Sequence, residues 1–173
     1  APLWKISFDS ISDAAAQLKA LGPSWYPLLW TLHRRGGLIA EKARALKPRE
    51  REWPFRIPNR RVGAFTLVDE HTMLACPAVD NPFVGAHPHF VENKVDPPSS
   101  AYLKLQEALV RLDFVPGPEH RCMDAGACPG GWTWVLARSS ALVDAVDRSP
   151  LDERLMANPR ISFSTGNAFS RIP

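Results

Sequence analysis

Apolar and polar positions along the first residues predict short strands and helices in alternation. Residues 4–8 alternate apolar and polar side chains, as a half-buried strand does. Asp9 or Ser10 can cap the helix that follows, and Gly22 is a natural stop for that helix. The apolar segment 25–32 contains a proline, which favours an edge strand or a turn over an uninterrupted helix.

The next segments predict a helix, a loop, a hairpin and a linker. Residues 38–46 have helical apolar spacing and good helix formers, whereas residues 48–60 carry three prolines and much charge and are predicted to form a loop. Two strand-like runs, residues 61–68 and 73–79, are joined by four polar residues, which indicates a hairpin. Residues 82–98 are proline-rich and irregular, and we interpret them as a linker.

Beyond Ser99 the pattern becomes regular. An amphipathic helix is marked by apolar positions at Leu103, Leu105, Ala108, Leu109 and Leu112. Strands and helices then alternate as strand 121–125, helix 131–139, strand 141–147, a short helix near 150–157 and strand 160–164. This order predicts a right-handed parallel α/β sheet. We therefore expect a small α+β accessory domain over residues 1–95 and an α/β domain over residues 96–173.

Composition limits the choice of compartment and cofactor. The 173 residues are 45% hydrophobic and 23% charged, as in a globular protein, and no apolar run approaches the roughly 20 residues of a membrane span. The N-terminus lacks the basic-then-apolar pattern of a secretory signal. Cys76, Cys122 and Cys128 show no metal-ligand spacing, and their odd number argues against a disulfide framework. We expect a reducing, cytoplasmic compartment, no membrane and no metal.

Positive charge is concentrated between His33 and Arg61. This window holds ten basic and three acidic residues, a net charge of +7, in a chain whose total is +3. Trp53 and Phe55 interrupt the window, and a basic stretch with embedded aromatic rings suits an RNA backbone and a stacked base. The alternative is a solvated surface with i,i+4 ion pairs. On the first interpretation, the predicted RNA-binding residues are Arg34, Arg35, Arg49, Arg51, Arg60 and Arg61.

The segment from Cys122 to Thr133 has the pattern of a buried strand, a glycine-rich turn and the first turn of a helix. Glycine allows backbone conformations that a Cβ would block, and it lets a ligand lie against bare peptide. The helix N-terminus adds unpaired N–H groups and a partial positive charge. Such a turn is where open α/β sheets bind nucleotide-like ligands. Its spacing differs from the dinucleotide fingerprint and from the phosphate loop that ends in Gly-Lys-Ser/Thr.

The sequence Asp-Ala-Gly-Ala-Cys-Pro-Gly-Gly-Trp-Thr at residues 124–133 resembles the first motif of FtsJ-like ribose 2′-O-methyltransferases, in particular the 23S ribosomal RNA branch called RlmM. The resemblance covers roughly residues 72–173. It implies a Rossmann-like fold and S-adenosylmethionine (SAM) as methyl donor, held by Asp124, Gly126, Cys128, Pro129, Gly130, Gly131 and Trp132. In that branch an accessory RNA-binding region precedes the catalytic domain.

Two polar residues at later strand ends extend this implied site. Asp147, 21 residues after Gly126, can accept both ribose hydroxyls of a bound nucleoside, and the resemblance implies this role toward SAM. Asn167 stands where the family usually has an aspartate beside the adenine amino group, and its amide offers a carbonyl oxygen for that hydrogen bond. The alternatives are a helix cap for Asp147 and simple turn chemistry for Asn167.

Lys104 is the catalytic residue that the resemblance implies. Residues 99–105, Ser-Ser-Ala-Tyr-Leu-Lys-Leu, are similar to a Ser-Arg-x-x-x-Lys-Leu signature whose lysine belongs to a Lys-Asp-Lys-Glu set that activates the ribose 2′-hydroxyl. An ammonium beside that hydroxyl stabilises developing alkoxide charge. Ser100 stands where arginine is usual. Without the motif downstream, Lys104 would be interpreted as a solvated surface lysine.

The family's other three catalytic groups lie on strands after the third, whereas this sequence stops at Pro173. We therefore expect the first half of the parallel sheet only, with an open edge, and the front portion of a longer protein. The predicted function is a SAM-dependent RNA 2′-O-ribose methyltransferase acting on ribosomal RNA, with no metal. The alternatives are a non-catalytic module that binds RNA or SAM, and a small-molecule methyltransferase without affinity for RNA.

Overall fold

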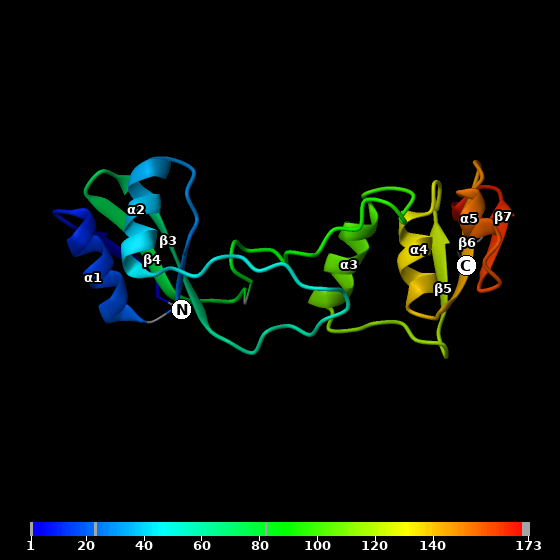
Figure 1. Cartoon of the computed structure of the whole chain (residues 1–173), viewed down its shortest axis with the longest axis horizontal. Coiled ribbons are helices and arrows are strands. Elements are labelled where there is room, and N and C mark those ends of the chain that lie inside the picture. Colours follow the sequence, from blue (N-terminus) through cyan, green and yellow to red (C-terminus); the bar gives the residue numbers. More distant parts are fainter. Residues whose placement is uncertain (1, 23, 82, 171–173) are drawn as a thin grey trace. The chain divides into compact units, whose positions relative to one another are not determined.

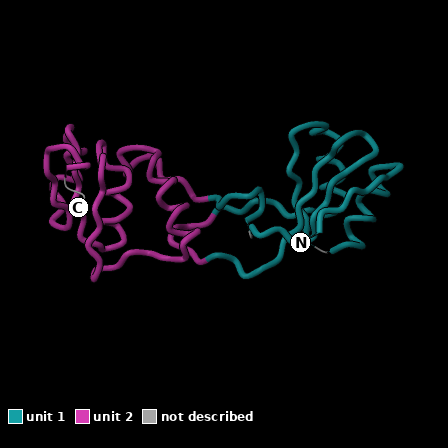
Figure 2. Tube along the Cα trace, turned by 180° about the vertical axis from the view of Figure 1, so that it is seen from behind, with its two compact units in different colours: residues 1–50, 57–89 teal, residues 51–56, 90–173 magenta. Residues whose placement is uncertain are grey.

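The computed structural model of the chain describes three stretches, residues 2–22, 24–81 and 83–170. The chain divides into two compact units, which Figure 2 colours separately. The first unit comprises residues 1–50 and 57–89, and the second comprises residues 51–56 and 90–173. Within the second unit a parallel sheet alternates with helices, which confirms the α/β fold expected from the sequence.

In its described residues, the first unit is a four-stranded sheet covered by two helices. Its elements are β1 (Trp4–Ser7), α1 (Ile11–Leu21), β2 (Trp25–Pro27), α2 (His33–Ala43), β3 (Val62–Asp69) and β4 (Thr72–Val79). The sheet has the order β1-β4-β3-β2, in which β2 is parallel to β3 and the other pairs are antiparallel. Both helices lie on one face of the sheet (Figure 1), where they pack on Phe65, Leu67 and Met73.

Helix α1 begins and ends at the residues that the sequence predicts. Ser10 is the N-cap, and its side-chain oxygen accepts a hydrogen bond from the Asp13 N–H at 3.1 Å. Gly22 ends the helix, and its N–H donates to the Leu18 carbonyl at 3.2 Å. Strand β2 follows at the edge of the sheet, as expected of an apolar segment that contains a proline.

Helix α2 begins five residues earlier than the predicted range of 38–46 and ends at Ala43. The helix includes Gly36 and Gly37, and such residues weaken the helical signal of a sequence because glycine has low helix propensity. Gly36 is buried, and a Cβ at this position would lie 2.5 Å from the Leu29 side chain. Close packing against Leu29 therefore favours a glycine inside this helix.

Replacing Gly37 by alanine is expected to raise the free energy of unfolding by about 0.5–1 kcal/mol, because alanine loses less backbone entropy in a helix. The new Cβ would have no protein atom within 4 Å. Gly36→Ala is the matched variant, and its gain should be smaller or negative because its Cβ must displace Leu29. Urea unfolding measures both variants, and equal stabilities would contradict the packing argument.

Strands β3 and β4 form the predicted hairpin, with a shorter connection than expected. Only Glu70 and His71 remain between the two strands. The Asp69 carboxylate accepts the His71 N–H at 2.8 Å and so fixes the turn. Residues 48–60 form the predicted loop, apart from one bridge between Arg51 and Phe90.

The second unit follows the predicted alternation of strands and helices. Its elements are α3 (Tyr102–Arg111), β5 (Arg121–Ala125), α4 (Gly131–Arg138), β6 (Leu142–Asp147), α5 (Glu153–Met156), β7 (Ile161–Thr165) and the 3₁₀ turn η1 (Ala168–Ser170). All strands of the β5-β6-β7 sheet are parallel. Helix α4 packs on β5 and β6, and α3 packs on α4 (Figure 1). Only α5 is clearly shorter than expected, because its predicted span begins with Pro150 and Leu151, which precede the Asp152 cap.

Strand β5 carries the glycine-rich turn and, among the described strands, pairs with β6 alone. The central β6 is buried on both sides through Val143, Ala145 and Val146, as expected of a strand in a parallel sheet. No helix in the described part of the chain is long and apolar enough to cross a membrane.

Candidate active site

The glycine-rich turn lies between β5 and α4. Gly126 leaves the strand at a φ of 84°, and its N–H donates to the Val146 carbonyl on β6 at 2.9 Å. Gly130 has a φ of 117° and is the N-cap of α4, where it offers no side chain to cap the helix. The N-cap residue therefore adds no side-chain cap to the first N–H groups of α4, an arrangement that favours anionic or polar ligands.

A cavity of about 260 Å³ lies over this turn. Lys104 on α3 lines the same cavity as the turn, although at least twenty residues separate them along the chain. Most residues expected to bind SAM also line it, namely Asp124, Gly126, Cys128, Pro129, Gly131 and Trp132. The structure thus brings the proposed catalytic residue and the proposed cofactor turn into one space.

Close packing holds the start of α3 against the start of α4. A Cβ on Gly131 would lie 2.5 Å from the Ser99 hydroxyl oxygen. The turn is packed as closely against α5, because a Cβ on Gly130 would overlap the Leu155 side chain. The Trp132 indole N–H donates to the Ala101 carbonyl at 3.0 Å. Sequence reasoning missed Ser99 and Ala101 as cavity residues, because their contacts with α4 are distant along the chain.

Asp147 lies at the end of β6 and fixes the conformation of the turn. One carboxylate oxygen accepts the Cys128 N–H at 2.9 Å, and the other accepts the Ser149 N–H at 3.0 Å. These N–H groups, Ser149 foremost, hold the pKa of Asp147 below its ordinary value. Asp147 does not cap the next helix, because Asp152 is the N-cap of α5.

Asn167 follows β7 and is exposed. Its side-chain carbonyl oxygen accepts the Phe169 N–H at 3.1 Å, which is the turn chemistry that the sequence left open as an alternative. Neither Asn167 nor Asp147 is among the described residues that line the cavity over the glycine turn.

Asp124 and Thr133 form a buried pair beneath the turn. The Thr133 hydroxyl donates to an Asp124 carboxylate oxygen at 2.6 Å, and the two residues are 0% and 4% exposed, respectively. Burial raises the pKa of Asp124 above its ordinary value, although the hydrogen bonds from Thr133 oppose the rise. The pair joins the strand to the first turn of α4. Sequence reasoning missed Thr133, whose only signal was its place in the motif.

Asp124→Asn is expected to gain stability relative to the wild type as the pH rises. Because the folded-state pKa of Asp124 is raised, its contribution to stability is complete below the unfolded pKa of about 4 and is lost as the pH rises through the folded pKa. The folded-state pKa of Asp147 is lowered, so its contribution is present above about pH 4 and is lost as the pH falls through the folded pKa. Asp147→Asn should therefore lose stability relative to the wild type as the pH rises.

Urea unfolding of the wild type and both variants between about pH 3 and pH 7 measures this difference, because the window of Asp147 lies below its unfolded pKa of about 4 and that of Asp124 lies above it. Both substitutions keep a side-chain carbonyl oxygen, so each retains a hydrogen-bond acceptor while the charge is removed. If both variants gained stability relative to the wild type as the pH rises, or both lost it, the environments assigned to Asp124 and Asp147 would be contradicted.

The predicted RNA-binding arginines fall into both units. Five belong to the first unit, namely Arg34, Arg35, Arg49, Arg60 and Arg61. The Arg35 guanidinium lies 5.6 Å from the centre of the Phe8 ring. Arg51 belongs to the second unit, where its guanidinium lies 5.4 Å from the centre of the Phe55 ring. No single unit therefore carries the whole set, although all of these arginines except Arg35 are exposed.

The residues at the turn fit a bound SAM. A Cβ on Gly126 would meet no protein atom within 4 Å, so the main chain here is open to a ligand. The Trp132 ring lines the cavity and is 44% exposed, which provides an apolar wall. Asp147 keeps further lone pairs beside the Cys128 N–H. The described residues contain no group of three or more potential metal ligands.

Comparison with known proteins gives matches over the second unit and over the whole chain. Residues 98–172 match the FtsJ-like methyltransferase family. The chain is 32% identical to ribosomal RNA large subunit methyltransferase M of Xanthomonas euvesicatoria pv. vesicatoria over 99% of this chain and 47% of that protein. It is 39% identical to the protein of the same name from Saccharophagus degradans over 53% of this chain and 28% of that protein.

The chain thus spans about half the length, or less, of the curated relatives that it matches. Among solved structures, a putative hemolysin from Lactococcus lactis aligns with a TM-score of 0.39 and 27% identity, over 42% of this chain and 36% of that one.

Proposed function

We propose that the protein transfers a methyl group from SAM to a ribose 2′-hydroxyl of ribosomal RNA, because residues 98–172 match the FtsJ-like methyltransferase family. The observation that carries this proposal is the cavity that Lys104 shares with the glycine-rich turn. The names of the curated relatives point to RNA of the large ribosomal subunit as the substrate class.

SAM supplies an electrophilic methyl group on a sulfonium and leaves as a neutral thioether. The main chain from Gly126 to Gly131 would hold its methionine part, with the first N–H groups of α4 toward the carboxylate. Asp147 would accept the ribose hydroxyls on lone pairs that the Cys128 and Ser149 N–H groups do not use. Asn167 would approach the adenine with the remaining lone pair of its amide oxygen.

Lys104 would bind the ribose 2′-oxygen that attacks the methyl group. Its exposed side chain reaches the cavity from α3. The ammonium would donate a hydrogen bond to the 2′-oxygen and stabilise the negative charge that develops there while the hydroxyl proton passes to solvent water, the new O–CH₃ bond forms and the C–S bond of SAM breaks. No metal is required, because the leaving group is neutral and positioning of the two reactants contributes much of the acceleration.

RNA binding would draw on the accessory domain proposed for residues 1–95, ahead of the methyltransferase domain proposed for residues 96–173. The exposed arginines, among them Arg34, Arg49 and Arg60, would neutralise backbone phosphates and release counterions. We place the reaction in the cytoplasm, where ribosomal RNA is accessible and where the free thiols of Cys76, Cys122 and Cys128 stay reduced.

The test is methyl transfer from isotope-labelled SAM to ribosomal RNA transcribed in vitro, which carries no methyl groups. The assay uses the complete gene product, because the chain spans about half the length of its curated relatives. After nuclease digestion, we expect the label in one 2′-O-methylated nucleoside. Label in a base would contradict the reaction. Binding of SAM and RNA without any transfer would favour the non-catalytic module instead.

A further inference from the structure

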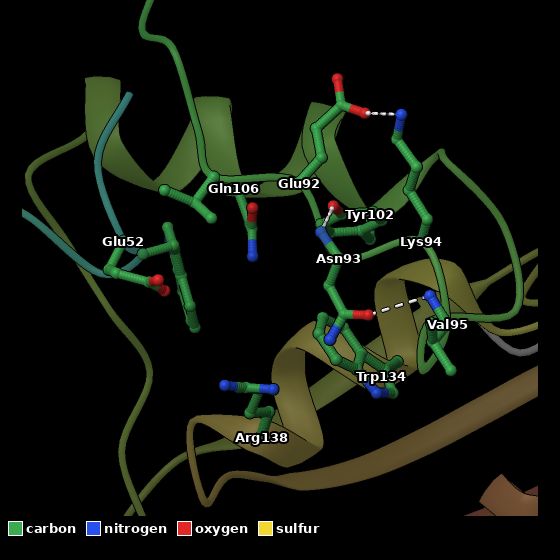
Figure 3. Close-up of a pocket in the computed structure, with 11 residues that line it drawn as sticks. Glu52, Glu92, Asn93, Lys94, Val95, Tyr102, Gln106, Trp134 and Arg138 are labelled. Carbon is green, nitrogen blue, oxygen red and sulfur yellow. Dashed lines mark hydrogen bonds and ion pairs between the residues drawn. The ribbon is translucent and has the colours of Figure 1, made fainter. Parts of the chain in front are cut away.

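The second unit contains another cavity, which has a volume of about 480 Å³ and shares no lining residue with the cavity over the glycine turn. Aromatic side chains form its walls, namely Trp53, Tyr102 and Trp134. Arg138 lies beside it with its guanidinium 5.1 Å from the centre of the Trp134 ring (Figure 3). The volume is in the usual range for a small-molecule or base-sized ligand.

Two polar side chains that line this cavity have no hydrogen-bond partner among the described residues. Gln106 on α3 is 5% exposed, lines the cavity, and its amide lies between Glu52 and Asn93 (Figure 3). The amide makes no hydrogen bond within the described part of the chain. The Trp53 indole N–H is also buried without a hydrogen-bond partner among the described residues. A buried group such as the Trp53 N–H is costly unless a ligand or water satisfies it, and the Gln106 amide is left free to pair with a ligand in the cavity.

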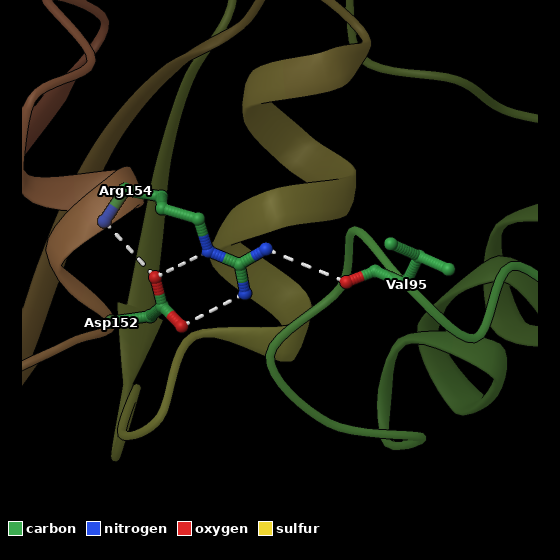
Figure 4. A network of polar contacts seen from close by, with 3 residues as sticks. All are labelled: Val95, Asp152 and Arg154. Atoms are coloured by element: carbon green, nitrogen blue, oxygen red, sulfur yellow. Dashed lines mark hydrogen bonds and ion pairs between the residues drawn. The ribbon is translucent and has the colours of Figure 1, made fainter.

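The wall opposite Gln106 is held in place by hydrogen bonds. The Asn93 N–H donates to the Tyr102 hydroxyl at 2.7 Å, and the Asn93 side-chain oxygen accepts the Val95 N–H at 3.0 Å. Arg154 anchors the same segment, because its guanidinium binds both oxygens of Asp152 and donates to the Val95 carbonyl at 3.4 Å (Figure 4). The cavity is therefore built into the free protein rather than formed by its ligand.

The chemistry of the cavity matches a nucleobase. A glutamine amide presents a donor and an acceptor side by side, which is the pattern that pairs with the edge of an adenine. Indole and phenol rings stack on bases, and single-stranded RNA is recognised through such rings. The charges at the rim, Glu52 and Glu92 against Lys94 and Arg138, balance one another, as a neutral base requires. Arg138 is placed to pair with an adjoining phosphate.

We propose that this cavity binds one unstacked base of the RNA substrate, with Gln106 and the Trp53 N–H pairing with its edge and the aromatic rings enclosing its faces. The inference rests on the proposed function, since it takes RNA as the partner. It adds a recognition site for a nucleotide other than the methylated one, because Lys104 and the glycine-rich turn line a different cavity.

The experiment measures fluorescence anisotropy of the full chain with two short single-stranded oligonucleotides. One has abasic ribose at every position, and the other carries a single central adenine. Stacking and edge pairing of one base predict that the wild type binds the adenine-bearing oligonucleotide about tenfold more tightly, or better.

Gln106→Met removes the amide while it keeps the length of the side chain. We expect the variant to lose most of the preference for adenine, to bind the abasic oligonucleotide like the wild type, and to melt at the same or a higher temperature. Trp53→Phe keeps a ring and loses the N–H, so its loss of preference should be smaller. Glu107→Gln, on the same helix but outside the cavity, is the matched control and should retain the full preference.

Equal affinity of the wild type for both oligonucleotides would overturn the proposal, and so would a Gln106→Met variant that keeps the preference for adenine. Free adenosine that binds as tightly as the adenine-bearing oligonucleotide would replace RNA by a nucleoside as the ligand and would also overturn it. Failure of the proposed function is a separate result, because it appears as absent SAM binding or absent methyl transfer, which these anisotropy measurements do not contain.

Discussion

Lys104→Ala is expected to lower the rate of methyl transfer to ribosomal RNA by about 10²–10⁴-fold, the usual contribution of a positioned side chain that assists the removal of a proton in the transition state. Lys104 lines the cavity over the glycine-rich turn, and its side chain is exposed toward that space. SAM affinity should change little, because the proposed SAM contacts come from the main chain of the turn and from Asp147. The measurements are single-turnover methyl transfer and SAM calorimetry on the same variant.

Two variants control for the loss of positive charge and for general damage. Lys19→Ala removes an exposed lysine from another helix, α1, and should leave the rate unchanged. Lys104→Arg keeps the charge, but its planar guanidinium does not replace a compact ammonium, so only part of the rate should return. A Lys104→Ala protein that transfers methyl groups at the wild-type rate would remove this lysine from the mechanism.

Gly130→Ala is expected to lower the free energy of unfolding and to abolish measurable SAM binding together. The residue has a φ of 117°, a backbone conformation that residues with a side chain rarely adopt, and such strain costs about 1–3 kcal/mol. The Cβ would also overlap Leu155, which is 6% exposed and packs with Leu151, so overpacking adds about 1–3 kcal/mol. Relief of this overlap moves the start of α4 and with it the N–H groups of the turn.

Gly126→Ala distinguishes an effect on SAM binding from an effect on the stability of the fold. Its φ of 84° imposes strain, but the new Cβ would meet no protein atom within 4 Å. We therefore expect a smaller loss of stability than for Gly130→Ala. The affinity for SAM should be lowered, because the alanine side chain occupies space over the turn. Urea unfolding and calorimetry measure both quantities. Equal stability of the two variants would contradict the packing assigned to Gly130.

Local signals predicted the elements well because glycine, proline and capping residues mark element ends in the sequence itself. Helix α1 begins after Ser10 and ends before Gly22 as expected, and β5 spans the predicted residues 121–125. The same reliance on local signals failed at α2, since Gly36 is retained for its packing on Leu29, a contact outside the helix.

The site was predictable where one contiguous motif carries it, and not where distant segments meet. The turn itself was identified from its glycines, whereas the Ser99 contact with Gly131 depends on the packing of α3 against α4. The basic window is one stretch in the sequence, whereas residues 51–56 pack with the second unit and separate Arg51 from the other arginines. Gln106 carried no signal, since a polar residue on an amphipathic helix is ordinarily exposed.

The central claim is that SAM lies on the turn from Gly126 to Trp132. Isothermal titration calorimetry of the folded chain with SAM, and with its demethylated product, tests this claim most directly. We predict saturable binding of one molecule of either compound to the wild type, weakened in Gly126→Ala and absent in Gly130→Ala. No heat of binding to the correctly folded wild type, or equal binding to all three proteins, would contradict the account.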